Sequence, residues 1–210
     1  MNKLLRIRKS FFGALLLAVL LAAAGAGNAA PVHAQNPGLY AHLLADGQFV
    51  YGPNTAGFDL YAFLDQAAPH LSPSAAALEG TAGYASLNPR LLLALMEVRT
   101  GLLSNPAADP ADPYGWEETG FEAQVLAATE VMSGAYYLHL HHFSALDPSE
   151  RTLPPLLLAD GSELAVDPAV NAGTYAVLAF LAHTETADSI QTYIESFTGT
   201  WAGLFPGDDP

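Results

Sequence analysis

One stretch, residues 88–101 with the sequence NPRLLLALMEVRTG, constrains the fold of this 210-residue chain more than any other. Asn88 is a favoured N-terminal cap for a helix, and Pro89 suits the first helical position, where no N–H donor is needed. The residues that follow are apolar on almost every side of the helix, apart from Arg90, Glu97, Arg99 and Thr100. Such a helix must be covered on every side. We therefore predict a central buried helix from residue 88 to about residue 103.

The first 34 residues have the parts of a secretory signal peptide. Four basic residues lie within the first nine, residues 11–24 are apolar, and Val32 and Ala34 stand at the −3 and −1 positions of a cleavage site. We predict cleavage after Ala34 and secretion to the extracellular space or the exterior of the cell envelope. A membrane anchor formed by the same segment is the alternative. No later segment is apolar enough over a sufficient length, so no membrane span is expected after cleavage.

The charge balance of the rest of the chain excludes several classes of partner. Beyond residue 34 the sequence has three arginines, no lysine and 21 acidic residues, a formal charge of −18. Such a surface repels nucleic acid and anionic membranes, so neither is expected as a partner. The sequence has no cysteine, so no disulfide bond supports the fold and its stability must come from the core.

Periodicity and turn residues predict a mainly α domain with one small β-hairpin. Residues 35–57 read as irregular, with a short strand in QFVYGP, and residues 105–120 read as a long loop. Apolar runs on both sides of Asp160-Gly161 predict the hairpin. Besides the central helix, we expect helices at 60–67, from Ser72-Pro73 to about 84, at 121–141, from a cap at Asp167-Pro168 to about 183, and at 186–198. The predicted domain spans residues 58–205, and residues 206–210 form a tail.

The histidines of YLHLHHF are weak candidates for a metal site. His139 and His141 are two residues apart, and on a helix such positions point about 200° apart. His139 and His142 are three residues apart and share a face. Cations near the C-terminus of a helix also complement its dipole, which explains these residues without a metal. We therefore expect no metal and no other cofactor.

Glu97 is the acidic residue of the central helix and the candidate for acid–base chemistry. Burial disfavours the charged form of a carboxyl group, which suits a general acid. The alternative is an ion pair with Arg90 or Arg99, and we favour it because buried acids are usually paired.

The central helix resembles the first motif of the lysozyme-like lytic transglycosylases, in which a capped apolar helix ends in Glu-Ser-Gly. Thr100-Gly101 match the Ser-Gly of that motif, and Arg99 stands where the catalytic glutamate is expected. The Gly-Leu-Met-Gln motif of the family is missing. The resemblance implies a lysozyme-like helical fold. Its chemistry does not extend to Arg99, because a guanidinium keeps its proton in this pH range.

Longer segments are similar to the non-catalytic N-terminal region of secreted bacterial zinc metallopeptidases of the lysostaphin type. They are VYGPNTAGFDLYAFL, LNPRLLLALMEVRTGLLSNP and LLLADGSELAVDPAVNAGTYAVLAFLA, in that order along the chain. In those proteins the peptidase domain with its zinc ligands follows this region. The resemblance implies that the present 210 residues lack both.

Three hypotheses for function follow. The first is a secreted, non-catalytic module that binds cell-wall peptidoglycan or assists a separate secreted peptidase, with a cleft lined by Arg99, Thr100, Tyr114, Trp116 and Tyr136. The second is a peptidoglycan-cleaving, lysozyme-like enzyme that uses Glu97. The third is a folded remnant of a truncated metallopeptidase. An open cleft at Arg99 would favour the first hypothesis, whereas an ion pair between Arg99 and an acid would argue against that cleft.

Overall fold

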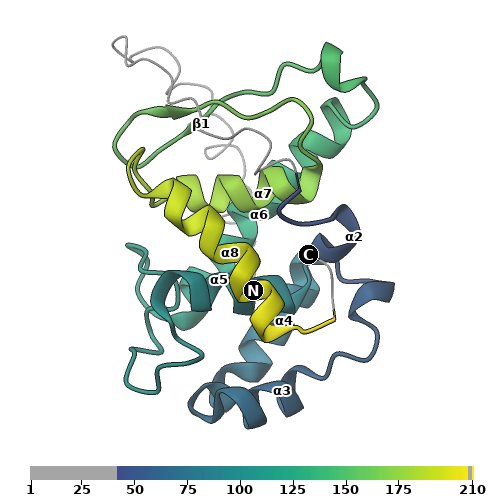
Figure 1. Cartoon of the computed structure of the whole chain (residues 1–210). Coiled ribbons are helices and arrows are strands. Elements are labelled where there is room, and N and C mark those ends of the chain that lie inside the picture. Colours follow the sequence, from purple (N-terminus) through teal and green to yellow (C-terminus); the bar gives the residue numbers. More distant parts are fainter. Residues whose placement is uncertain (1–41, 208–209) are drawn as a thin grey trace, which may run out of the picture. The chain divides into compact units, whose positions relative to one another are not determined.

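The computed structural model describes residues 42–207 and 210, and it confirms a mainly α fold (Figure 1). The predicted signal peptide, residues 1–34, lies outside the described residues. None of the helices in the described part is long and apolar enough to cross a membrane. The α-helices are α2 (Asp46–Phe49), α3 (Leu60–Ala67), α4 (Ala75–Ala85), α5 (Pro89–Thr100), α6 (Phe121–His142), α7 (Ala172–Ala182) and α8 (Ile190–Leu204).

Helix α5 lies at the centre of the core, as predicted. Every residue from Leu91 to Met96 has a side chain that is fully buried. The Asn88 side chain accepts a hydrogen bond from Arg90 N at 3.0 Å, which is the expected cap. The helix ends at Thr100, earlier than the predicted residue 103, because Gly101 adopts a left-handed conformation with φ of +63° and reverses the chain.

The longer helices pack against one another in pairs. Helix α6 packs along α7, and α8 packs across α5, with α4 against α6 (Figure 1). Helix α8 begins at Ile190, later than the predicted residue 186, and continues to Leu204, beyond the predicted end at residue 198. Trp201 explains the extension: its side chain is fully buried and contacts Phe205 edge-on, and the helix must persist to place it there.

The start of the described chain docks on the N-terminus of α7. Thr174 Oγ1 accepts hydrogen bonds from Leu43 N and Leu44 N at 2.9 and 3.3 Å. Asn171 Nδ2 donates to Leu44 O at 2.9 Å, and Gly173 N donates to Asp46 Oδ1 at 2.8 Å. These bonds join segments that are distant in sequence, and the bond from Gly173 N supplies a partner for an N–H group of the first turn of α7, which lacks one within the helix.

Two local features of this region differ from the prediction. The expected strand in QFVYGP is instead the short helix α2 followed by a single bridge between Val50 and Leu87. The cap of α7 is Asn171, which accepts from Thr174 N, and not Asp167. Asp167 closes a turn before the helix by accepting from Ala169 N at 2.8 Å. An Asp-Pro pair suits a turn as well as a helix start, so the sequence alone left the choice open.

Within residues 42–207, the remaining connections contain the predicted hairpin and three short 3-10 helices. Strands β1 (Leu156–Leu157) and β2 (Glu163–Leu164) pair antiparallel around Asp160-Gly161, as expected. The 3-10 helices are η3 (Pro53–Thr55), η4 (Pro69–Ser74) and η5 (Pro148–Glu150). Pro73 therefore lies inside η4, and α4 begins at Ala75, slightly later than predicted.

Candidate functional site

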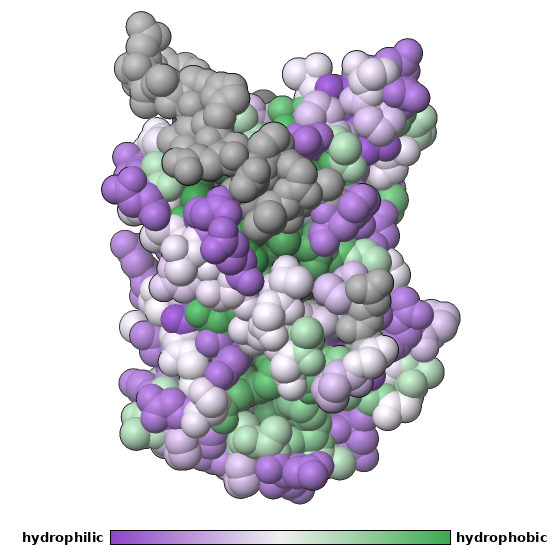
Figure 2. Space-filling model, in the orientation of Figure 1, coloured by the Kyte–Doolittle hydropathy of each residue, from purple (hydrophilic) through white to green (hydrophobic). Residues whose placement is uncertain are grey.

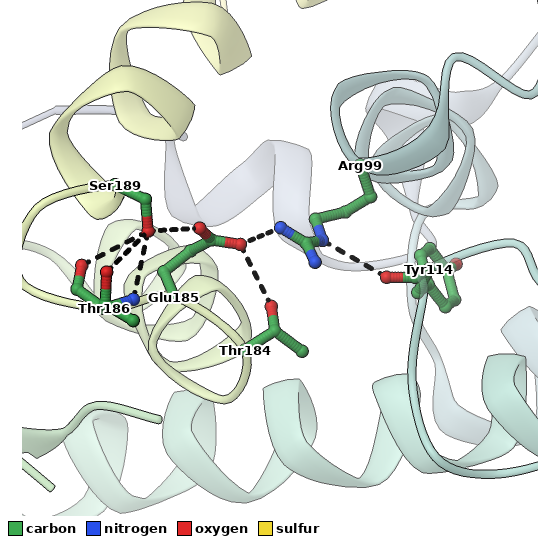
Figure 3. A network of polar contacts seen from close by, with 6 residues as sticks. All are labelled: Arg99, Tyr114, Thr184, Glu185, Thr186 and Ser189. Atoms are coloured by element: carbon green, nitrogen blue, oxygen red, sulfur yellow. Dashed lines mark hydrogen bonds and ion pairs between the residues drawn. The ribbon is translucent and has the colours of Figure 1, made fainter. Parts of the chain in front are cut away.

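Arg99, at the C-terminal end of α5, forms an ion pair with Glu185 from the turn between α7 and α8 (Figure 3). The two side chains are 11% and 5% exposed, so the pair is largely removed from solvent. Arg99 Nε also donates to the carbonyl oxygen of Tyr114 at 3.2 Å, and the guanidinium lies 4.7 Å from the centroid of the Tyr193 ring. The residue that stands where a lysozyme-like acid was expected is thus a paired cation.

Glu185 organises the turn that leads into α8. Its second oxygen accepts from Ser189 Oγ at 2.7 Å, and Thr184 Oγ1 donates to the oxygen that faces Arg99 at 3.2 Å (Figure 3). The Ser189 hydroxyl in turn accepts from Thr186 N at 3.0 Å. Glu185 was not among the residues singled out from the sequence, and its one signal is that it follows an apolar helix as an acid flanked by threonines.

The long loop of residues 101–120 is held against α5 and α6 by two polar side chains. The Thr100 hydroxyl lies 3.0 Å from the carbonyl oxygens of both Met96 and Pro113. Gln124 of α6 is buried; it accepts from Tyr114 N at 3.0 Å and donates to Glu118 O at 2.8 Å. Gln124 is a further organising residue that the sequence analysis missed.

The structure brings four of the five predicted cleft residues together. Arg99 and Thr100 contact the loop that carries Tyr114 and Trp116, and both of these aromatic rings lie 5.1 Å from the ring of Phe180. Tyr136 lies apart from them, stacked on Phe49 with ring centroids 4.1 Å apart. The Tyr114 ring is fully buried, and burial raises its pKa well above the ordinary value. A ligand-binding role for these residues stays a prediction.

Exposure decides what these aromatic rings offer to a ligand. Trp116 is 7% exposed and Tyr136 is 5% exposed, so neighbouring side chains cover the faces of both rings. Trp116 also contacts the exposed His183, with ring centroids 4.4 Å apart. A sugar ring would have to displace these contacts in order to stack on either residue.

Glu97 is not paired with Arg90 or Arg99, so the favoured ion pair was wrong. Glu97 Oε2 accepts hydrogen bonds from Leu103 N at 2.9 Å and Ser104 N at 3.1 Å. The left-handed turn at Gly101 brings these N–H groups back over the end of α5, where they bind the carboxylate. Arg90 instead donates to Asn54 O at 3.3 Å and lies 4.7 Å from the centroid of the Phe58 ring.

The histidines do not converge. His139 is buried, with its ring 5.7 Å from that of Tyr175, whereas His142 is exposed. Residues 42–207 contain no group of three or more His, Cys, Asp or Glu side chains that is placed to hold a metal ion. Burial, with a smaller contribution from the charge of Arg151, lowers the pKa of His139.

The buried His139 makes the stability of the protein depend on pH. Because its pKa is lower in the folded than in the unfolded state, the unfolded chain binds the proton more readily. The free energy of unfolding is therefore expected to decrease as the pH falls below about 6.5, the ordinary pKa of histidine. Urea unfolding at pH 7.5 and pH 5.5 measures this. His139→Gln should reduce the difference, and His142→Gln, at an exposed position, should leave it unchanged; equal effects of the two variants would contradict the assignment.

Comparison with known proteins places this fold in a family. Residues 42–210 match the sequence model of the family described as LasA, N-terminal domain. Protease LasA of Pseudomonas aeruginosa strain PAO1 is 39% identical over 97 residues, which cover 45% of this chain and 23% of that protein. Protease LasA of strain UCBPP-PA14 matches with the same identity and coverage. No solved structure matches the chain.

The family match confirms the resemblance to the N-terminal region of a peptidase that the sequence predicted. It covers every residue that the structure describes, including α5 with Arg99 and the turn with Glu185. The part of the chain that matches the curated relatives spans less than a quarter of their length. The chain therefore belongs to the family of LasA N-terminal domains.

Proposed function

We propose that this protein is a secreted, non-catalytic module that assists a LasA-type peptidase at the bacterial cell wall by binding the peptidase domain. The family to which the chain belongs is named for the N-terminal domain of a protease, which supports a role beside a peptidase. The secretory signal predicted in residues 1–34 supports a site of action outside the cell.

The ion pair of Arg99 with Glu185 is the main support for a module without catalytic activity. A glycoside hydrolase normally needs a placed carboxylic acid beside the scissile bond. Here the expected position of that acid is occupied by a guanidinium, which does not act as a proton donor near neutral pH. Glu97 lies two residues away, and its carboxylate accepts two backbone N–H bonds that tie it to the loop.

Contact with a peptidase is better supported than contact with a glycan. The aromatic residues predicted to stack on sugars are buried among Phe49, Phe180 and each other. The formal charge of −14 for the whole chain disfavours approach to anionic cell-wall polymers. The same charge favours a partner with a basic surface, because complementary potentials speed encounter and suppress wrong partners.

The test is binding in trans. The purified protein, produced from the whole chain, is passed over an immobilised LasA-type peptidase domain, with an unrelated acidic protein of similar net charge as the control. We expect saturable binding at micromolar concentration that weakens with added salt. Absence of binding, or equal binding of the acidic control, would contradict the proposed function and favour the hypothesis of a remnant without a present role.

The enzyme hypothesis is tested separately on purified peptidoglycan. We expect no loss of turbidity with the protein or with Glu97→Gln, and no retention of the protein on insoluble peptidoglycan at moderate salt. Lysis that disappears in Glu97→Gln would establish the alternative, in which Glu97 is the catalytic acid. Retention without lysis would shift the proposed contact from the peptidase to the glycan.

A further inference from the structure

A pocket of about 310 Å³ lies between the segment that follows α2, helix α3 and helix α4. It shares no residue with the Arg99–Glu185 pair. Its lining includes the exposed Tyr51, Tyr61, Asp59 and Glu79, with the buried Leu60 and Pro89 at its floor. Figure 2 shows hydrophobic surface, bordered by hydrophilic residues, over the part of the molecule where α3 lies.

Two tyrosine rings at this pocket are exposed, in contrast to the buried rings near Arg99. Tyr51 is 55% exposed and Tyr61 is 44% exposed. Exposed aromatic rings in the lining of a pocket offer π-faces, and the negative face of a tyrosine ring attracts a cation. Helices α3 and α4 hold the Tyr61 ring and the Glu79 carboxylate, so these two groups of the site rest on regular elements rather than on loop tips.

The acidic side chains of the pocket are oriented by the protein itself. The Tyr61 hydroxyl donates to Glu79 Oε2 at 3.0 Å, and this bond is the main reason that the pKa of Tyr61 is raised. Asp59 Oδ1 accepts from Ala62 N at 3.0 Å as the cap of α3. A carboxylate has about four acceptor positions, so both groups keep capacity for further donors.

The charge distribution of the chain points to a cationic ligand. Beyond residue 9 the sequence has no lysine, and each of its three later arginines is bound within the fold. Arg90 adjoins the floor of the pocket through the Phe58 ring, and against this single charge the pocket presents two carboxylates. A cationic donor adds Coulomb attraction to its hydrogen bonds with carboxylates, which a neutral hydroxyl does not, and this favours a cation over a sugar.

We propose that this pocket binds one basic side chain, an arginine or a lysine, presented by a polypeptide partner. Its guanidinium or ammonium group lies between the Tyr51 and Tyr61 rings and donates to Glu79 and Asp59. The inference rests on the proposed function in one respect: the side chain belongs to the peptidase. The pocket therefore provides a specific contact within an interface that the overall negative charge favours only in a general way.

The experiment uses a hexa-arginine peptide as the probe and the ¹⁵N-labelled protein, produced from the whole chain, in an NMR titration at physiological salt. Hexaglycine is the uncharged probe, and a chitin hexasaccharide is the sugar probe. We expect amide shifts confined to the surroundings of Tyr51, Asp59, Tyr61 and Glu79 with hexa-arginine, and none with the other two probes. Binding of the hexasaccharide alone would overturn the proposal and assign a sugar site.

Two glutamates provide a matched pair of variants. Glu79→Gln and Glu130→Gln remove the same charge from exposed positions on α4 and α6, and unfolding curves check that both variants fold. We expect Glu79→Gln to weaken hexa-arginine binding about tenfold and Glu130→Gln less than about twofold. Tyr51→Ala should weaken binding by removing one ring. Equal weakening by the two glutamine variants, or amide shifts spread over the whole surface, would overturn the assignment of the pocket as the binding site.

The outcomes separate this inference from the proposed function. If the immobilised peptidase domain binds the protein but hexa-arginine does not bind the pocket, the proposed function stands and the pocket assignment fails. If hexa-arginine binds the pocket and the peptidase does not, the site exists but belongs to another basic partner, which contradicts the proposed function.

Discussion

Replacing Glu185 with glutamine is expected to lower the free energy of unfolding by about 3–5 kcal/mol, because it leaves the Arg99 charge buried without its partner. Glutamine has nearly the shape of glutamate; its oxygen can accept from Thr184 and its NH2 group can donate to the Ser189 hydroxyl, so the loss reports mainly on charge. Chemical unfolding of both proteins, with the same m-value, measures the difference. The exposed Glu130→Gln provides the control and should change stability by less than about 0.5 kcal/mol.

The double variant Arg99→Met with Glu185→Leu tests the reason for that loss. Removing both charges leaves no uncompensated ion, so most of the stability is expected to return. The buried Tyr114 carbonyl and Ser189 hydroxyl lose partners in this variant, which limits the recovery. If the double variant is no more stable than Glu185→Gln, the loss in the single variant arises from packing and not from the buried charge.

Replacing Gly173 with alanine is the second change with a large expected effect. A Cβ atom at this position would lie 2.7 Å from Leu44 O and 3.2 Å from Ala45 O, both of which are backbone atoms. The segment around Leu44 would have to move, which strains its hydrogen bonds to Thr174 and Asn171. We expect a loss of about 1–3 kcal/mol from overpacking, although alanine is the better helix former.

Gly134→Ala provides the matched control for Gly173→Ala. Both glycines lie inside helices, but the space around Gly134 is open, with no atom within 4 Å of an added Cβ. Its replacement by alanine is therefore expected to stabilise the protein, by up to about 1 kcal/mol, through helix propensity alone. Thermal or urea unfolding of the two variants compares them directly, and equal stabilisation by both would contradict the close docking of residues 43–46 on α7.

The candidate site shows where reasoning from the sequence succeeded and where it did not. The position of Arg99 at the end of the central helix, and its inability to serve as an acid, follow from the chain NPRLLLALMEVRTG alone. The partner of Arg99 does not, because Glu185 comes from a turn that is distant in sequence. Glu97 was expected to pair with an arginine, but it instead accepts hydrogen bonds from two backbone N–H groups that the turn at Gly101 places beside it. A hydrogen bond to a nearby backbone N–H immobilises only the glutamate side chain, whereas an ion pair with arginine would immobilise two long side chains.

The mainly α fold, the start of α5 at Asn88-Pro89 and the hairpin at Asp160-Gly161 can all be predicted from the sequence. Each depends on interactions within a few residues, namely caps, turn conformations and the burial of an apolar face. Contacts between distant segments set the docking of residues 43–46 on α7, the pairing of Arg99 and the burial of Tyr114 and Trp116. Those features depend on which distant segments meet, because a buried charge or a helix terminus takes its partner from whatever the folded chain places beside it.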